Sequence, residues 1–379
     1  MKIKSHYPMY RYLMVLTIAS TVGLQAWRTL FDNFAVHVCH LEGFHVGVLQ
    51  SVREIPGFLA LLAIYILLII KEHRLSAISV LTLGLGVCAT GFFPSWMGLI
   101  FTTLVMSFGF HYFETTNQSL TLQYFDTKTS PWVLGKLRSF ASASNIVAGV
   151  VIFISAPYFE YHEMYAGIGF LVILAGAWAF FQNPVDKTLV PQHKRMIIRK
   201  RYILFYFLTL MAGARRQIFV AFAVFLMVRQ FEYSVQLISI LFVVNNIINY
   251  FISPFIGKWI IRFGERKVLS VEYFSLMFIF IAYAYVNQAW IVAVLYVLDH
   301  IFFNFAIAIR TYYQKIADPK DIAPGMAVGF TINHIAAVVI PTIGGMLWMI
   351  DYRIPFVCGA AMSFISLCAV QWIKTPDRV

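Results

Sequence analysis

Charged residues are scarce in this sequence of 379 residues. Only 12% of the chain is Asp, Glu, Lys or Arg, and just 17 residues are acidic, whereas about a quarter of the residues in soluble domains are charged. So low a charge content excludes an ordinary soluble domain. The mean hydropathy of +0.76 and the hydrophobic share of 60% instead indicate an all-α integral membrane protein.

Cysteine is also rare. The four cysteines lie within or at the ends of apolar runs, and none belongs to a C-x-x-C motif or to a cluster with histidine. This pattern gives no sign of a redox or metal site, and cysteines in apolar runs usually act as small buried residues. We therefore expect no metal and no cofactor.

The sequence lacks the common motifs of hydrolytic enzymes. It contains no H-E-x-x-H and no G-x-S-x-G, and no loop is long enough for a soluble catalytic domain. The pairs Asp299–His300 and His111–Glu114 leave an intramembrane enzyme as a less favoured alternative, because each could act as an acid and a base. We expect a protein that is not an enzyme.

Long apolar segments are abundant. A helix needs about 20 apolar residues to cross the hydrocarbon core of a bilayer, and twelve segments qualify. Their approximate limits are 11–36, 45–70, 75–93, 96–124, 134–157, 163–183, 202–228, 233–256, 267–286, 289–313, 323–349 and 353–373. The links between them are short except for the basic stretch 186–201, which divides an N-terminal half (1–185) from a C-terminal half (202–379). The sequence thus predicts twelve membrane spans in two six-helix bundles joined by a cytoplasmic linker.

The basic residues divide unequally between the two sides of the membrane. With the N-terminus inside, 23 of the 29 Lys and Arg residues fall on the cytoplasmic side, two lie outside and four lie within spans. This asymmetry follows the positive-inside rule, so the net charge of +12 requires no nucleic-acid partner. We predict a multi-pass protein with both termini cytoplasmic, and the short loops favour a bacterial inner membrane.

An internal repeat supports two equivalent halves. Shifting the chain by about 189 residues places His111 on His300 and Gln182 on Gln371, and a shift of 188 places Arg28 opposite Arg216. Transporter folds often contain such repeats.

Polar residues inside the spans follow a period of three helices. Spans 3, 6 and 12 have no charge in their middles, and span 9 has only Glu272, near its cytoplasmic end. Polar side chains are costly in a bilayer and normally face a protein interior or a watery cavity. We therefore expect every third helix to be peripheral and the others to share a polar interior.

This architecture resembles that of the major facilitator superfamily. The link between spans 8 and 9 is similar to the cytoplasmic motif of that family, G-x-x-x-D-R-x-G-x-R-[KR], although Ile261 replaces its acidic residue and the first-half copy is reduced to four residues, 71–74. The matching residues are Gly257, Arg262, Gly264, Arg266 and Lys267. The resemblance implies two bundles that alternately open one cavity to each side, a gating role for this motif, and a monomer.

Arginine and asparagine residues near the middles of the spans are the candidates for binding substrate. Arginine is always charged and grips carboxylate or phosphate through two parallel hydrogen bonds, and asparagine can bind polar groups of a substrate or join helices. Because consecutive helical residues point about 100° apart, only one residue of the pair 215–216 needs to face a cavity, and the repeat favours Arg216. The candidates are Arg28, Arg53, Arg216, Arg215, Asn245, Asn246 and Asn333.

Acidic and histidine residues at similar depth are the candidates for carrying protons. A buried carboxyl group tends to be protonated, and histidine titrates near neutral pH. The candidates are Glu114, Asp299, Glu54 and Asp32, with His111, His300 and His334 as relays. Two alternatives stay open: the histidines pack structurally, and Arg28, Asp32, Arg53 and Glu54 form a static network closing the outer side.

The sequence therefore predicts a secondary active transporter of a small anionic or zwitterionic organic solute, coupled to protons. The four arginines within the spans balance four central acids, which makes a purely cationic substrate less attractive. Proton-driven export of amphipathic drugs is the alternative, and a receptor without transport is a further one.

Overall fold

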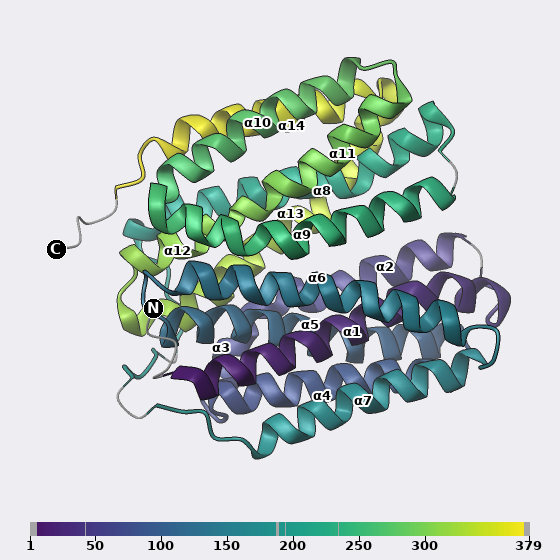
Figure 1. The fold of residues 1–379 in the computed structure, drawn as a ribbon, viewed down its shortest axis with the longest axis horizontal. Coiled ribbons are helices and arrows are strands. Elements are labelled where there is room, and N and C mark those ends of the chain that lie inside the picture. Colours follow the sequence, from purple (N-terminus) through teal and green to yellow (C-terminus); the bar gives the residue numbers. More distant parts are fainter. Residues whose placement is uncertain (1–5, 42, 187–188, 194, 234, 375–379) are drawn as a thin grey trace. The chain divides into compact units, whose positions relative to one another are not determined.

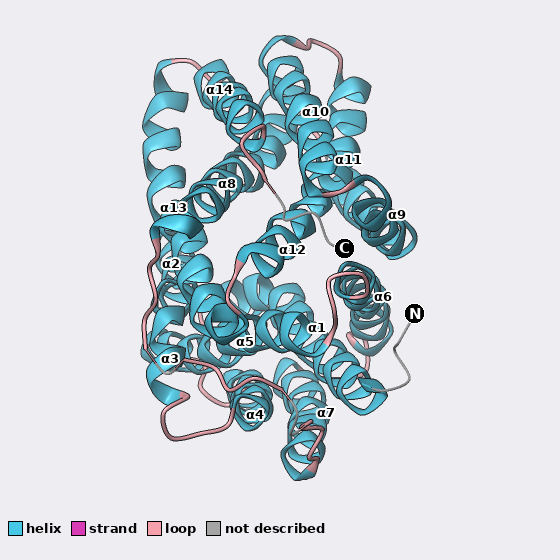
Figure 2. Ribbon diagram, turned by 90° about the vertical axis from the view of Figure 1, so that its left-hand side faces the viewer, coloured by secondary structure: helices cyan, strands magenta, loops and turns pink. Residues whose placement is uncertain are grey.

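The computed structural model describes residues 6–41, 43–186, 189–193, 195–233 and 235–374. Within these ranges the regular structure is entirely helical, with no strand (Figures 1 and 2). The helices of the first half are α1 (Tyr7–His37), α2 (Gly43–Phe58), α3 (Ala63–Ile66), α4 (Glu72–Thr90), α5 (Trp96–Tyr124), α6 (Ser130–Ser155) and α7 (Tyr161–Phe181). Those of the second half are α8 (Ile203–Phe231), α9 (Val235–Phe263), α10 (Glu265–Tyr285), α11 (Ala289–Phe303), α12 (Ile307–Ile316), α13 (Ile322–Ile350) and α14 (Arg353–Val370).

The twelve predicted spans correspond to twelve long helical stretches, because α2 with α3, and α11 with α12, each make one span. Eleven of these stretches in the described part of the chain are both long and apolar enough to cross a membrane. The twelfth, α1, has 31 residues, but Gln25 and Arg28 lower its hydropathy. The all-α, two-bundle membrane fold predicted from the sequence is confirmed.

Two spans are interrupted by short 3-10 segments. Residues Leu59–Leu62 (η2) separate α2 from α3, and Asn304–Ala306 (η4) separate α11 from α12. At the first break, the amide N–H of Leu61 donates to the Thr331 hydroxyl at 2.9 Å, and the Leu59 carbonyl accepts from the Tyr112 hydroxyl at 3.2 Å. Backbone groups freed from a helix inside a membrane need such partners.

The chain forms two compact units. The first contains Met1–Asp126, Phe140–Ile197 and Pro319–Thr331. In it α4 packs between α5 and α7, and α1 packs against α7 (Figure 2). Glycines permit these close contacts, since a Cβ atom on Gly109 of α5 would lie 2.3 Å from the backbone nitrogen of Leu83 on α4. Small residues allow this approach of helices in membranes.

The second unit contains Thr127–Ser139, Ile198–Asp318 and Ile332–Val379. Here α10 packs along α14, α8 packs against α14, and α11 packs against α9 and α10. Buried aromatic side chains fill the space between these helices, including Phe222, Phe280, Tyr283 and Phe356. Glu272 of α10 is fully buried in this unit, whereas Val271, Phe274 and Phe278 of the same helix are exposed, so Glu272 lies on the protein-facing side of a helix that also has an apolar outer surface.

Candidate functional site

A group of polar side chains in the second unit lies deep inside membrane-spanning helices. We call Arg138 of α6, Arg216 of α8, Asn245 and Asn249 of α9, His300 of α11 and Asn304 of η4 the polar tract. Asn304 holds the tract together: its amide nitrogen donates to Asn249 Oδ1 at 2.5 Å and to the carbonyl of His300 at 2.7 Å. Its amide oxygen accepts from Arg138 Nε at 3.2 Å.

His300 is the next member of the tract. Its Nδ1 atom lies 2.9 Å from Asn245 Nδ2 and 3.1 Å from the carbonyl oxygen of Tyr296. The ring also meets Phe219 of α8 edge-on, with centroids 4.8 Å apart. Arg138 and Arg216 are both close enough to His300 to act on it electrostatically. The imidazole therefore sits beside two positive charges.

The two arginines of the tract keep their guanidinium groups accessible. Arg138 and Arg216 are both exposed, although each lies on a membrane-spanning helix. Among the described residues, Arg216 has no hydrogen-bond or ion-pair partner. A charged side chain at such a depth faces water or protein rather than lipid. The tract can thus offer cationic hydrogen-bond donors to an anion.

Arg138 was not among the residues predicted to bind substrate. The sequence placed the start of this span at residue 134 and counted Arg138 with the cytoplasmic basic residues. The helix begins at Ser130, so Arg138 lies about two turns inside it. Asn304 was not among the predicted site residues either.

Arg215 and Asp299 occupy a different environment from their neighbours in sequence. The Arg215 side chain is fully buried, stacks on the Tyr273 ring at 4.4 Å and donates to the hydroxyl of Ser366 on α14. Asp299 is also fully buried. Arg215 thus contacts α10 and α14 and not the polar tract, whereas Arg216 has the exposure expected of the favoured member of the pair.

The remaining asparagines bond mainly to backbone. Asn246 is buried and donates to the carbonyl of Phe242 on its own helix at 2.9 Å. Asn333 of α13 donates to the carbonyl of Thr209 at 3.4 Å. Its backbone also lies close to α8, because a Cβ atom on Gly213 would meet the Asn333 carbonyl oxygen at 2.7 Å. These contacts suit helix packing.

Among the candidates in the first unit, Arg53 and Glu54 form an ion pair. Arg53 donates from its terminal nitrogen to Glu54 Oε1 at 2.6 Å, and both side chains are partly buried. Arg28 is exposed, and Glu114 accepts from Gln118 Nε2 at 2.7 Å. The Arg53–Glu54 pair joins two of the four residues of the predicted static network, and the roles of all these candidates stay predictions.

Three further candidates complete the set. His111 is buried and meets the Phe330 ring edge-on at 5.8 Å, and His334 is buried as well. The side chain of Asp32 lies outside the described part of the structure. The predicted proton relay through these residues stays a prediction.

The predicted gating motif has clear structural roles for both glycines. Gly257 lies where α9 approaches α6, since a Cβ atom there would meet the carbonyl oxygen of Pro131 at 2.4 Å. Gly264 has φ of 80° and lies directly before α10, a conformation that favours glycine. Gly264 therefore forms the tight turn between α9 and α10, whereas Gly257 lies within α9.

The charged residues of the motif make different contacts. Arg266 donates to Gln371 Oε1 at 3.1 and 3.2 Å, while Arg262 lies over the Phe263 ring at 5.3 Å and Lys267 is exposed. Sequence reasoning missed Glu265, which is buried and pairs with Lys315 Nζ at 2.7 Å. This acid stands inside the motif, four residues after the position where Ile261 replaces the usual acid.

The apolar helices and the mid-span polar tract define a polytopic helical membrane protein with two compact units. Residues 205–379 match the family model of the Major Facilitator Superfamily. A comparison with curated protein sequences gives no match. The family-model match covers the second half of the chain, so residues 205–379 are similar to that superfamily.

Solved transporters share this fold across nearly the entire chain. The human organic anion transporter MFSD10 (TETRAN) aligns with a TM-score of 0.78 at 9% identity, covering 97% of this chain and 99% of that one. A bacterial homologue of the iron transporter ferroportin in the outward-facing state gives 0.78 at 12% identity, over 96% and 98% of the two chains. FucP in the outward conformation, a transporter of Escherichia coli, gives 0.78 at 13% identity, over 98% and 100%. At these identities the likeness concerns the fold.

Proposed function

We propose that this chain is a secondary active transporter of a small anionic or zwitterionic organic solute, coupled to protons. The observation that carries the proposal is the pair of exposed arginines, Arg138 and Arg216, beside the amides and imidazole of the polar tract. A carboxylate is the ligand that such guanidinium groups hold best, through charge-assisted hydrogen bonds.

The surroundings of the two arginines support an anionic group over a cation. Asn304 and Asn249 are committed to each other, and among the described residues no acid pairs with Arg216. A lipophilic cation would meet two like charges here, which disfavours the alternative of a cationic drug exporter. The similar fold of a human organic anion transporter is consistent with the proposed substrate class.

The sequence features complete the proposal. The asymmetry of Lys and Arg supports cytoplasmic termini, and the short loops support a bacterial inner membrane. We further propose that residues 1–185 and 202–379 act as the two bundles, that 186–201 links them, and that the transporter is a monomer.

Thermal unfolding of the purified protein tests substrate class, because a ligand that binds only the folded state raises the unfolding temperature. The probes are lactate, succinate and benzoate as anions, leucine as a zwitterion, fucose as a neutral sugar and tetraphenylphosphonium as a cation. We expect stabilisation by an anion or the zwitterion, and loss of that stabilisation in Arg216→Ala and Arg138→Ala.

Arg229→Ala is the matched control, since Arg229 is an exposed arginine in the last turn of the same helix as Arg216. It should respond to the probes as the unmodified protein does. Stabilisation by tetraphenylphosphonium alone, or an unchanged anion response in Arg216→Ala, would reject the proposed substrate site.

A further inference from the structure

The ends of α1, α4 and α7 meet on one side of the first unit. In this unit α4 packs along α7, and α1 packs against both (Figure 2). The hydroxyl of Tyr12 on α1 donates to the carbonyl of His73, in the first turn of α4. This bond fixes the start of α1 beside the start of α4, at the end of the unit that the distribution of Lys and Arg predicts to be cytoplasmic.

An arginine adjoins each side of this bond, and both arginines contact α7. The guanidinium of Arg11 lies over the Trp178 ring at 5.8 Å from its centroid, and that of Arg74 lies over the Phe180 ring at 4.7 Å. Both rings belong to the last turn of α7, which ends at Phe181. Two arginines from different helices therefore flank the same helix end.

No carboxylate neutralises these arginines. Among the described residues, neither Arg11 nor Arg74 makes a hydrogen bond or an ion pair. Glu72, the acid closest to Arg74 in the chain, instead accepts from Gln123 Nε2 of α5 at 2.7 Å. Lys71 is exposed and adds a third positive charge. We call Arg11, Lys71 and Arg74 the basic triad, and its positive charge is available to an anion.

An apolar surface continues from the basic triad along α7. Phe181 is 80% exposed, and Phe170, Leu171 and Leu174 of the same helix are exposed as well. The helices α4 and α7 correspond to predicted spans 3 and 6, which have no charge in their middles. Tryptophan and basic residues are typical of the headgroup level of a membrane, with apolar side chains beyond them. The surface thus has the order of charges and apolar groups that a phospholipid has.

The chemistry of the triad suits a phosphate. A guanidinium that lies over a ring keeps its in-plane N–H groups for other partners, and these match the oxygens of a phosphate group. In an anionic phospholipid such a phosphate is joined to acyl chains, which fit the exposed face of α7. A free inorganic anion would contact the triad but would leave the apolar face without a partner. The two features together therefore favour a lipid.

We propose that the basic triad binds the headgroup of an anionic phospholipid in the cytoplasmic leaflet, with the acyl chains of the lipid along α7. Because the triad contacts three helices, a bound lipid should stabilise the first unit. The inference does not depend on the proposed transport activity, since none of the residues predicted to bind substrate or to carry protons belongs to the triad.

Thermal unfolding in detergent tests the site, because a lipid that binds only the folded protein raises the unfolding temperature. The probes are phosphatidylglycerol, which is anionic, phosphatidylcholine, which has a phosphate but no net charge, and inorganic phosphate. We expect greater stabilisation by phosphatidylglycerol than by the other two. The double variant Arg11→Gln/Arg74→Gln should lose this difference. Native mass spectrometry should show its affinity for phosphatidylglycerol reduced by roughly thirtyfold, the loss expected for two basic residues at an anionic surface.

The matched control is the double variant Lys258→Gln/Arg353→Gln. It also removes two exposed cations that lie over aromatic rings, but in the second unit. It should respond to phosphatidylglycerol as the unmodified protein does. An equal loss in this control would show a general attraction of positive charge and would overturn the proposal. Equal stabilisation by phosphatidylcholine or by inorganic phosphate would overturn it as well.

The variant Arg11→Lys/Arg74→Lys separates the shape of the guanidinium from its charge, because lysine keeps the charge but has no planar fork. We expect it to recover only part of the affinity lost in the glutamine variant, and full affinity would contradict the role of the two arginines. Unfolding in phosphatidylcholine verifies that each variant folds. If the double glutamine variant does not fold, Arg11→Gln alone should lower the affinity roughly fivefold, and an unchanged affinity there would reject the site.

Discussion

At the scale of single residues, the direction of a side chain decides the role of a charge in this protein. Arg215 and Arg216 differ by one position and about 100° around α8, yet one stacks inside the bundle and the other stays accessible. A buried ion tolerates this position only with compensating groups nearby, since an isolated charge in an apolar medium is strongly disfavoured. We therefore expect the stability of the fold to depend on the specific partner of each buried charge.

The ion pair between Glu265 and Lys315 gives a direct test. Glu265 is 1% exposed, so Lys315→Met leaves its carboxylate buried without a countercharge. We expect Lys315→Met to lower the free energy of unfolding by about 3 kcal/mol, measured by thermal unfolding in detergent. Replacing both residues by methionine should restore most of the loss, because no lone charge is then buried.

Lys320→Met serves as the control, because Lys320 is a largely exposed lysine outside this ion pair. An equal loss in the single Lys315 variant and the double variant would show that the pair's charges are not what stabilises this contact.

At the scale of helices, close packing in the first unit depends on glycines. Gly86 and Gly109 bring α4 and α5 together, and Gly169 brings α7 against Cys88 of α4. In a membrane the apolar side chains gain little by leaving lipid for protein, so helix association relies on close van der Waals contact. The small residues are therefore determinants of stability.

Gly109→Ala should destabilise this unit by about 1–3 kcal/mol, as expected for overpacking. The new Cβ atom would lie 2.3 Å from the backbone nitrogen of Leu83 and 2.4 Å from the carbonyl oxygen of Ser79, and backbone atoms cannot rotate away. Thermal unfolding measures the loss. Gly167→Ala on α7 is the matched control, because no atom lies within 4 Å of its Cβ position, and an equal effect there would disprove the packing argument.

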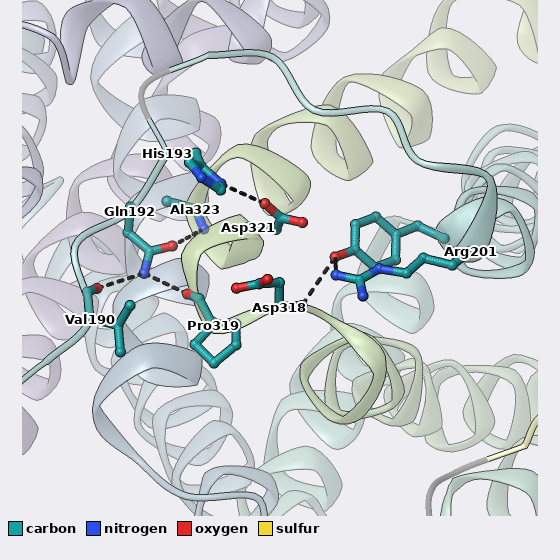
Figure 3. Close-up of polar contacts among 9 residues, drawn as sticks. Val190, Gln192, His193, Arg201, Asp318, Pro319, Asp321 and Ala323 are labelled. Carbon is teal, nitrogen blue, oxygen red and sulfur yellow. Dashed lines mark hydrogen bonds and ion pairs between the residues drawn. The ribbon is translucent and has the colours of Figure 1, made fainter.

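At the scale of the whole molecule, the linker between the two halves is anchored along part of its length. Gln192 donates to the carbonyl of Pro319 at 2.7 Å and accepts from the N–H of Ala323 at 2.9 Å (Figure 3). His193 Nδ1 lies 2.8 Å from Asp321 Oδ1, and the His193 N–H donates to the carbonyl of Lys320 at 2.8 Å. This segment is thus fixed to the start of α13.

Hydrogen exchange tests this attachment. Gln192→Ala removes the acceptor of the Ala323 amide, and a hydrogen bond contributes about 1 kcal/mol, so exchange at Ala323 should rise about fivefold. The amide of His193 should exchange faster as well, because the linker loses its neighbouring contacts. Gln288→Ala, which removes only a contact with Trp290, should leave both amides unchanged, and unaltered exchange in the Gln192 variant would contradict the anchoring.

The sequence by itself determined the membrane class and the twelve spans, and it placed a glycine at position 264, where the motif turns. These features depend on local composition: an apolar run long enough to cross the bilayer, and a residue that permits positive φ at Gly264, as observed. The breaks within two spans were harder to predict, because no proline or glycine marks the one at Asn304.

Only the tertiary structure decided which polar residues meet. It brought Asn304 into contact with Arg138 and Asn249, which precede it by 166 and 55 residues in the chain. It also placed Arg215 and Arg216 in different environments. Sequence periodicity gives the depth of a residue in the membrane, but the rotation of each helix about its axis is set by packing against its neighbours. That rotation is the physical reason why the spans could be predicted while the contacts of the polar tract could not.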